Sequence, residues 1–239
     1  MMGAPTYDKN KYYRIMDRTQ SNYANQLKRL IRSENRSNFI LIYYSLFLII
    51  SPLTAKFYPN LFDEQWISYS GIILSTVVLI YSIVNSKADY TNRISKIQAA
   101  LNTVKTLKRE VGGLQYSQAI EVSENGTQLN EFERIKKKYD EIVCSTEVRD
   151  DLDFFQTIRQ LCKRYGLNHM NGKKKTNYDN NSSNDEIEEV LGYIAEINPL
   201  LQWFKIIIIS LFHIIIYLIP IVILGIGFLV KLFTNLPNI

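Results

Sequence analysis

The chain has 239 residues, with 28 Lys and Arg against 23 Asp and Glu, and a formal net charge of +5. This length suffices for one compact domain, or for a smaller domain plus membrane segments. The mean hydropathy of −0.10 is an average over three strongly apolar blocks and a polar remainder. Two cysteines, Cys144 and Cys162, and two histidines argue against a disulfide framework and against a Cys/His metal site.

The N-terminal region predicts a helix before any membrane segment. Residues 1–9 are expected to form a disordered leader, and the first 35 residues lack the apolar core of a cleaved signal peptide. From 10 to 37, Tyr23, Leu27 and Leu30 recur at helical spacing opposite a basic face. This helix could lie on a membrane surface or continue into the first span. Its narrow, Tyr-rich apolar face favours packing against another cytoplasmic helix.

Two apolar runs follow, at 39–58 and 66–84. The first has no charge before Lys56, and the second has none. A helix of about 19 residues spans roughly 28 Å, close to the hydrocarbon thickness of a bilayer. We therefore predict a transmembrane helical hairpin whose first helix acts as an uncleaved signal anchor. Pro52 and the pair Pro59-Asn60 are expected to mark the outer end of that helix and the turn.

Charge placement predicts the orientation of the hairpin. Eight Lys and Arg residues lie within the first 36 positions and six more lie between 87 and 111, whereas the link carries Lys56 against Asp63 and Glu64. This distribution places both ends of the hairpin in the cytoplasm. Topology and anionic lipid thus account for most of the basic excess, and no direct nucleic-acid partner is expected.

Small and polar residues repeat at seven-residue steps within the hairpin. One set occupies the first helix: Ser37, Tyr44 and Ser51. The other occupies the second helix, with a glycine between its members: Ser68, Gly71, Ser75 and Ser82. A seven-residue repeat keeps one helix face aligned, and small residues allow close helix approach. The second set is a candidate either for helix packing or for lining a conduit in a homo-oligomer.

The middle of the chain predicts further cytoplasmic helices. The helix 87–111 carries a bundle-type seam of Ile94, Ile97, Leu101 and Val104, and should end at Gly112-Gly113. A third amphipathic helix is expected at 129–165, broken near 144–146, with Ser145 or Thr146 capping its second part. Together with 10–37, these segments form a cytoplasmic helical bundle. Three aspartates in the last segment are expected to form a solvated helix start: Asp150, Asp151 and Asp153.

The C-terminal region predicts a flexible loop at 166–185 and then, within 186–239, a short acidic helix and a third transmembrane helix at about 203–230. Twenty-five residues, 206–230, lack a formal charge, enough to span with tilt. Pro220 should kink this helix. A re-entrant pair of half-helices is the alternative, although each half would be too short to span. Three spans would place the C-terminus outside.

A search for catalytic motifs finds no phosphate loop, nucleophile elbow or metal-ligand pattern, so neither a catalytic residue nor a cofactor is predicted. His213 stands out because it lies at membrane depth, with Ser210 and Tyr217 on its face. It could be a neutral histidine bonded to either residue or to a neighbouring helix. Alternatively, it lines or gates a pore in an oligomer.

The order of these segments resembles the SLATT family, the two-transmembrane effectors associated with SMODS and SLOG systems in bacteria. The features run from Tyr12-Tyr13-Arg14 through the basic helix and the hairpin to about Val111, and extend to about Arg164. The resemblance assigns 10–165 to a SLATT-like domain. It implies a hairpin that forms a pore or disrupts the inner membrane when a linked sensor detects infection. Such sensors include nucleotide-signalling enzymes and, in some subfamilies, reverse transcriptases. The third hydrophobic block departs from the two-helix pattern.

The sequence thus predicts an all-α membrane protein with an N-terminal hairpin, a cytoplasmic helical bundle and an additional C-terminal transmembrane helix. We expect a non-enzymatic effector of an antiviral conflict system in the bacterial inner membrane. Its expected partners are the lipid bilayer, further copies of itself and a sensor protein encoded nearby. A membrane-anchored adaptor that tethers a cytoplasmic partner is the alternative. A small transporter is disfavoured, because the spans lack an ion-coordinating carboxylate.

Overall fold

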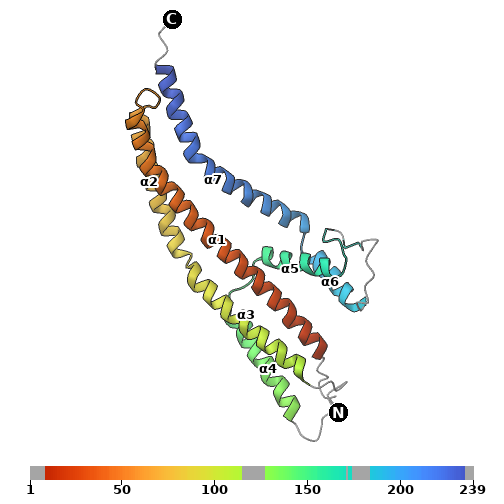
Figure 1. Cartoon of the computed structure of the whole chain (residues 1–239). Helices are drawn as coiled ribbons and strands as arrows, with labels where there is room; N and C mark the ends of the chain where they lie inside the picture. The colour runs from red at the N-terminus through yellow and green to blue at the C-terminus, as the bar shows by residue number, and fades with distance from the viewer. Residues whose placement is uncertain (1–8, 115–126, 171, 174–183, 235–239) are drawn as a thin grey trace. The chain divides into compact units, whose positions relative to one another are not determined.

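The computed structural model describes residues 9–114, 127–170, 172–173 and 184–234 (Figure 1). Residues 1–8 of the predicted leader and most of the predicted loop at 166–185 lie outside these residues, whereas Lys9 begins the first helix. The regular elements described are helices, and three helical stretches are long and apolar enough to cross a membrane, within 10–57, 64–113 and 199–234. The fold is therefore that of an all-α membrane protein, as the sequence predicted.

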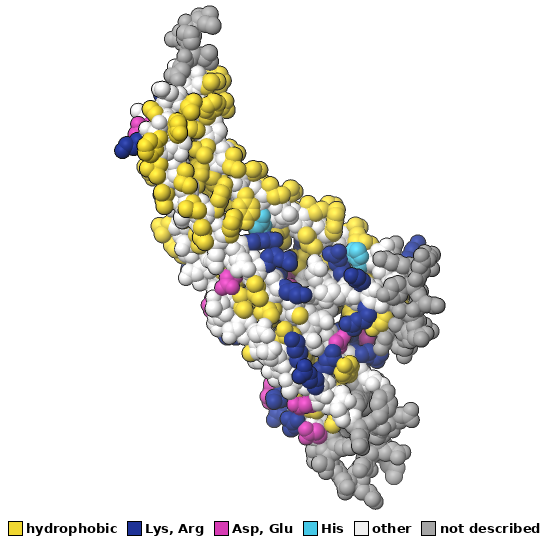
Figure 2. Space-filling view, viewed as in Figure 1, with side chains coloured by type: hydrophobic (Ala, Val, Ile, Leu, Met, Phe, Trp, Pro, Cys, Tyr) yellow, Lys and Arg dark blue, Asp and Glu magenta, His cyan; other side chains and the backbone are white. Residues whose placement is uncertain are grey.

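The chain divides into two compact units. The first, here called the bundle, comprises Met1–Ile31 and Thr91–Gln202. The second, here called the membrane unit, comprises Arg32–Tyr90 and Trp203–Ile239. Large apolar side chains cover the surface of the membrane unit, whereas Lys and Arg side chains gather over the bundle (Figure 2).

Helix α1, Lys9–Phe57, contributes to both units. It is one uninterrupted helix of 49 residues, so the basic N-terminal segment continues directly into the first span. Pro52 lies inside the helix, which ends at Phe57, so the expectation that Pro52 marks its outer end is wrong. A proline is tolerated in a membrane helix because neighbouring groups can satisfy the backbone that it frees.

A single buried stripe runs along α1 at seven-residue steps. Its members are each at most 6% exposed: Met16, Tyr23, Leu30, Ser37, Tyr44 and Ser51. The polar repeat predicted for the first span is therefore the membrane part of a longer stripe. A strict seven-residue repeat keeps one face of a long helix against its neighbours, as in a coiled coil.

Helices α2, Glu64–Lys87, and α3, Tyr90–Gly113, follow with a short break between them. The Asp63 carboxylate caps α2 by accepting a hydrogen bond from the Trp66 amide at 2.7 Å. At the break, Asp89 has a left-handed backbone with φ of 45°, which a short polar side chain tolerates better than most. Helix α3 ends at the predicted glycine pair. Of the expected seam residues, Ile97, Leu101 and Val104 are buried and Ile94 is half-buried.

Helices α4, Thr127–Ser145, and α5, Asp151–Arg164, are separated near the predicted break. The cap of α5 is Asp150, which accepts from the Leu152 amide at 3.0 Å, and not Ser145 or Thr146. Those two hydroxyls instead donate back to the Ile142 carbonyl, at 3.1 and 2.6 Å. They therefore close α4, and α5 begins only after several further residues.

The bundle core is formed by apolar side chains of α1, α3, α4 and α5. Its largest members are less than 2% exposed: Met16, Leu30, Ile97, Leu107, Phe132, Ile135, Phe155 and Ile158. Helix α6, Asn184–Glu196, adds Val190 to the buried set. The edge of the Tyr12 ring packs against Phe132, with ring centroids 5.1 Å apart.

Helix α7, Pro199–Thr234, is continuous through Pro220, which excludes the re-entrant alternative. The helix bends along its length (Figure 1). In the membrane unit, α7 contacts Tyr44 of α1 at Ile216, and Phe62 near the hairpin turn at Phe228. It therefore runs in the same direction as the first span, and its C-terminal end lies at the end of the unit that holds the hairpin turn.

Candidate functional site

The predicted serine face of α2 lies on the surface of the chain. Ser68, Ser75 and Ser82 are exposed, and Gly71 is half-buried with no neighbour that an added Cβ would meet within 4 Å. Helix α2 instead buries a different face, whose members are Ile67, Ser70 and Leu74. Within a single chain, the predicted face is thus not used for packing between α1, α2 and α7. Whether it lines a conduit in an oligomer stays a prediction.

His213 lies half-buried on α7. Its Nδ1 is 2.5 Å from the carbonyl oxygen of Ile209, one helical turn earlier, so an N–H at that position donates to the backbone. The predicted partners were Ser210, Tyr217 or another helix, and the contact found is with none of these. The histidine can therefore be satisfied locally, without a second helix.

The buried faces of the three membrane helices are held by hydroxyl, amide and indole groups. At one end of the hairpin, Ser37 of α1 donates to the Asn85 side-chain oxygen of α2 and lies 3.1 Å from the Tyr81 hydroxyl. Bonds of this kind between membrane helices avoid the burial of charge in a medium of low dielectric constant.

Two adjacent tyrosines join α1 to the backbone of α7. The Tyr44 hydroxyl donates to the Ile216 carbonyl at 2.8 Å, and the Tyr43 hydroxyl donates to the Tyr217 carbonyl at 3.2 Å. Tyr44 belongs to a buried apolar cluster with Ile40 and Leu74. The contact therefore combines apolar packing with hydrogen bonds to main-chain acceptors.

Near the hairpin turn, α2 approaches α7 through a tryptophan. The Trp66 indole nitrogen donates to the Ile223 carbonyl at 3.2 Å. A Cβ at Gly227 would lie 2.9 Å from Trp66 Cδ1, so the indole fits only because this position has no side chain. Gly227 is thus required by close helix contact.

The side of α7 that faces the hairpin was missed in the sequence. Its contacts recur at seven-residue steps. Ile216 and Ile223 pack against the cluster of Tyr44 and Leu74, and Gly227, seven residues after the buried Pro220, lies against Trp66. The signal was available, since the same repeat in the first span had identified the buried face of α1. In a block that is apolar on all sides, however, periodicity of hydrophobicity does not distinguish this face.

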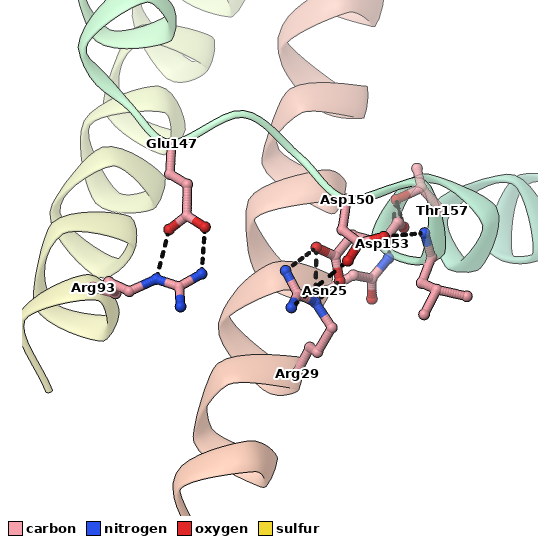
Figure 3. A network of polar contacts seen from close by, with 8 residues as sticks. Asn25, Arg29, Arg93, Glu147, Asp150, Asp153 and Thr157 are labelled. Atoms are coloured by element: carbon pink, nitrogen blue, oxygen red, sulfur yellow. Dashed lines mark hydrogen bonds and ion pairs between the residues drawn. The ribbon is translucent and has the colours of Figure 1, made fainter. Parts of the chain in front are cut away.

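The bundle is held by charged groups instead (Figure 3). Arg29 of α1 donates to both carboxylate oxygens of Asp153 on α5, from Nε at 2.9 Å and from Nη2 at 2.9 Å. Asp153 is 2% exposed, so the expectation that it belongs to a solvated helix start is wrong. Beside it, the Asn25 amide donates to the Thr157 hydroxyl at 3.0 Å, and Arg93 of α3 pairs with Glu147.

A cleft of about 200 Å³ lies between α1, α5 and α6. It is lined by three arginines, two carboxylates, three tyrosines and two apolar side chains: Arg14, Arg18, Arg164, Asp17, Glu189, Tyr13, Tyr165, Tyr193, Leu161 and Val190. Arg18 pairs with Glu189 at 2.5 Å, and Arg164 pairs with Asp17 at 3.1 Å. These pairs fasten α6 and α5 to α1.

Asp17 is the anionic centre of this cleft. Burial would raise its pKa, but hydrogen bonds from Lys108 and Arg164, together with their charges, outweigh that effect and hold the pKa below its ordinary value. Asp17 therefore stays ionised and joins α1 to α3 and α5. Among the described residues, no group of three or more His, Cys, Asp or Glu side chains could hold a metal ion.

These features define a helical membrane protein in which one long helix is shared between a charged bundle and a three-helix membrane unit. The chain belongs to the SMODS and SLOG-associating 2TM effector domain family 5, whose model matches residues 4–226. The match includes most of the third hydrophobic block as well as the segment 12–111. No curated protein and no solved structure matches the chain.

Proposed function

We propose that this protein is a membrane-embedded effector of a bacterial conflict system that permeabilises or disrupts the inner membrane when a linked sensor is triggered. Membership of a two-transmembrane effector family supports an effector role. The sensor is proposed to be encoded nearby and to be either a nucleotide-signalling enzyme or a reverse transcriptase. Neither enzymatic activity nor direct nucleic-acid binding is part of the proposal.

The observation that carries the proposal is the continuity of α1. The same helix packs through Met16 and Leu30 in the bundle and through Tyr44 and Ser51 in the membrane unit. A rearrangement of the bundle that shifts or rotates α1 therefore acts directly on the membrane unit. Rigid elements with two discrete packing arrangements are the usual means of such coupling.

The exposed polar face of α2 supports assembly into a homo-oligomer. Ser68, Ser75 and Ser82 recur at seven-residue steps on a surface whose other members include the lipid-exposed Ile72 and Leu79. We propose that this face, together with Gly71 and with His213 of α7, lines the conduit or packs against another copy. The excess of Lys and Arg at the N-terminal side of the hairpin supports a cytoplasmic N-terminus and bundle, with the C-terminus outside.

Controlled expression with and without the linked sensor tests the effector role. With the sensor triggered, we expect loss of the membrane potential, measured with a voltage-sensitive dye, followed by growth arrest. A membrane-anchored adaptor would leave both unchanged. Unaltered potential and growth, at verified expression and triggering, would therefore support the adaptor function and contradict the effector function.

A triple variant tests the lining role: Ser68→Leu, Ser75→Leu and His213→Leu. If these side chains line a conduit, the variant should reach the membrane at normal abundance and fail to depolarise it. Thr76→Leu is the matched control, because this position is exposed and polar on the same helix but lies outside the serine repeat. Full toxicity of the triple variant would rule out the lining role.

A further inference from the structure

Pro220 creates a specific need in the backbone of α7. In an α-helix, each carbonyl accepts from the N–H four residues later, so Pro220, which has no N–H, leaves the Ile216 carbonyl without its helical donor. Both residues lie in the membrane unit, where no water is available in the hydrocarbon to replace that donor. An unsatisfied carbonyl at this depth strongly disfavours any arrangement that exposes it.

The Tyr44 hydroxyl supplies the missing donor. It lies 2.8 Å from the Ile216 oxygen, and Tyr44 itself is 4% exposed. The neighbouring bond from Tyr43 differs in kind, because its acceptor, the Tyr217 carbonyl, still has the N–H of Ile221 available within the helix. Of the two tyrosines, Tyr44 is therefore the one whose partner depends on it.

We propose that Tyr44 and Pro220 form a latch that holds α7 against the hairpin in the resting state, and that release of α7 frees this hairpin face to contact a second copy of the chain. This inference rests on the proposed effector function. Because the acceptor is a backbone carbonyl at one position, the latch selects one register of α7. Displacement of α7 leaves the Ile216 carbonyl unsatisfied until another donor reaches it.

The apolar contact of α7 with the hairpin is narrow, which makes a single polar contact important. In the apolar 18-residue window of α7, only 6% of the residues are buried within the chain. In lipid, burial of apolar side chains between helices brings no hydrophobic gain over contact with acyl chains. The attachment of α7 therefore depends on close packing at Gly227 and on hydrogen bonds such as that of Tyr44.

A double-mutant cycle tests the latch in resting membranes. The native cysteines are first removed by Cys144→Ser and Cys162→Ala. New cysteines then replace Phe62 and Phe228, whose ring centroids are 6.4 Å apart. The yield of a short thiol-specific crosslinker between these two cysteines reports the attachment of α7 to the hairpin. Tyr44→Phe should lower the crosslinking yield about threefold to tenfold, the range of one hydrogen bond between membrane helices. In a Pro220→Ala background the same change should have little effect, because the alanine restores an N–H that satisfies the Ile216 carbonyl within the helix.

Tyr43→Phe is the matched control and should change the yield little in either background. An equal loss for Tyr44→Phe with and without Pro220, or an equal loss for Tyr43→Phe, would overturn the latch. This measurement needs neither trigger nor toxicity, so it can succeed even if the effector function is wrong.

A second measurement tests the regulatory role. Three chains are expressed at the same level without the trigger. Tyr44→Phe should depolarise the membrane at a level where the unaltered chain and the double variant Tyr44→Phe/Pro220→Ala do not. The regulatory role is overturned under three conditions together. The unaltered chain is toxic when triggered, the crosslinking yields follow the expected double-mutant pattern, and Tyr44→Phe does not lower the expression level at which untriggered membranes depolarise.

Discussion

The two halves of α1 continue one buried stripe, but the members of the stripe differ in chemistry between them. In the bundle the stripe consists of Met16, Tyr23 and Leu30, whereas in the membrane unit it consists of Ser37, Tyr44 and Ser51. Outside the stripe, the membrane half exposes large apolar side chains, with Ile42 and Ile49 61% and 60% exposed. In water, the hydrophobic effect brings apolar side chains inward. In lipid that difference vanishes, and small or hydrogen-bonding side chains specify the interior.

The polar contacts follow the same division. The bundle uses charged pairs such as Arg29 with Asp153, whereas the membrane unit uses neutral donors such as Tyr44 and Trp66 on backbone carbonyls. A buried ion is far more costly to desolvate than a hydroxyl. One chain thus solves the same packing problem in two ways, and the following substitutions test the distinction from the largest expected effect to the smallest.

Truncation of a phenylalanine should show the largest difference in destabilisation between the bundle and the membrane unit. Phe155→Ala, at a position 1% exposed in the bundle, should lower the free energy of unfolding by about 3–5 kcal/mol because it leaves a cavity. Phe212→Ala, at a position 61% exposed on α7, should cost less than about 0.5 kcal/mol. Hydrogen exchange of the bundle amides in detergent-purified protein measures the first effect. Equal effects at both positions would contradict the division.

Removing one partner of the buried ion pair should have the next largest effect. Arg29→Met should destabilise the bundle by about 2–3 kcal/mol, because Asp153 stays buried without its partner while Arg29 itself is partly exposed. The double variant Arg29→Met/Asp153→Leu should recover part of the loss, since no lone charge remains. The readout is faster amide exchange in α5. A double variant less stable than Arg29→Met would contradict this account.

A polar truncation inside the membrane unit should be milder. Ser37→Ala removes the contact with Asn85 and should cost about 1 kcal/mol, as is usual for one hydrogen bond between membrane helices. Ser82→Ala, at an exposed position, should be near neutral in the single chain. Resistance of detergent-purified monomer to unfolding by SDS compares the two. A larger loss for Ser82→Ala would mean that the exposed face also packs in the monomer.

Acid should weaken the bundle through Asp17. Its pKa is lowered in the folded state, so its contribution is fully present above the ordinary pKa of about 3.9 and is lost as the pH falls through the lower folded value. Asp17→Asn should remove this part of the acid sensitivity. The measurement is the helical circular dichroism of the purified chain on heating at pH 7 and near pH 3. Identical acid sensitivity of the variant would argue against this role.

The two cysteine thiols should differ in their reactivity toward an alkylating reagent in the folded protein. Burial raises the pKa of the Cys162 thiol to about 11, whereas Cys144 is exposed. Because the thiolate is the reactive species, iodoacetamide near pH 8 should label Cys144 and leave Cys162 unmodified until the bundle unfolds. Mass spectrometry of intact protein should therefore show one label per chain. Two labels under native conditions would show that the bundle opens readily.

Much of the fold follows from local patterns in the sequence. The two apolar runs, the glycine pair after 111, and the uncharged run at 206–230 predict elements that the structure contains. Ser37, Tyr44 and Ser51 likewise predict the buried face of the first span. These features are local because helix period, chain-breaking residues and span length depend on near neighbours alone.

Long-range partners were decided by the tertiary structure. The Arg29–Asp153 pair joins residues 124 positions apart, and Tyr44 meets a carbonyl 172 positions away. In α2 the serine repeat lies on the surface, and Ile67, Ser70 and Leu74 face inward instead. A helix that is apolar on every side carries no hydrophobic period to identify its inner face. That choice depends on which neighbouring groups can approach closely and donate, and only the packed helices bring those groups together.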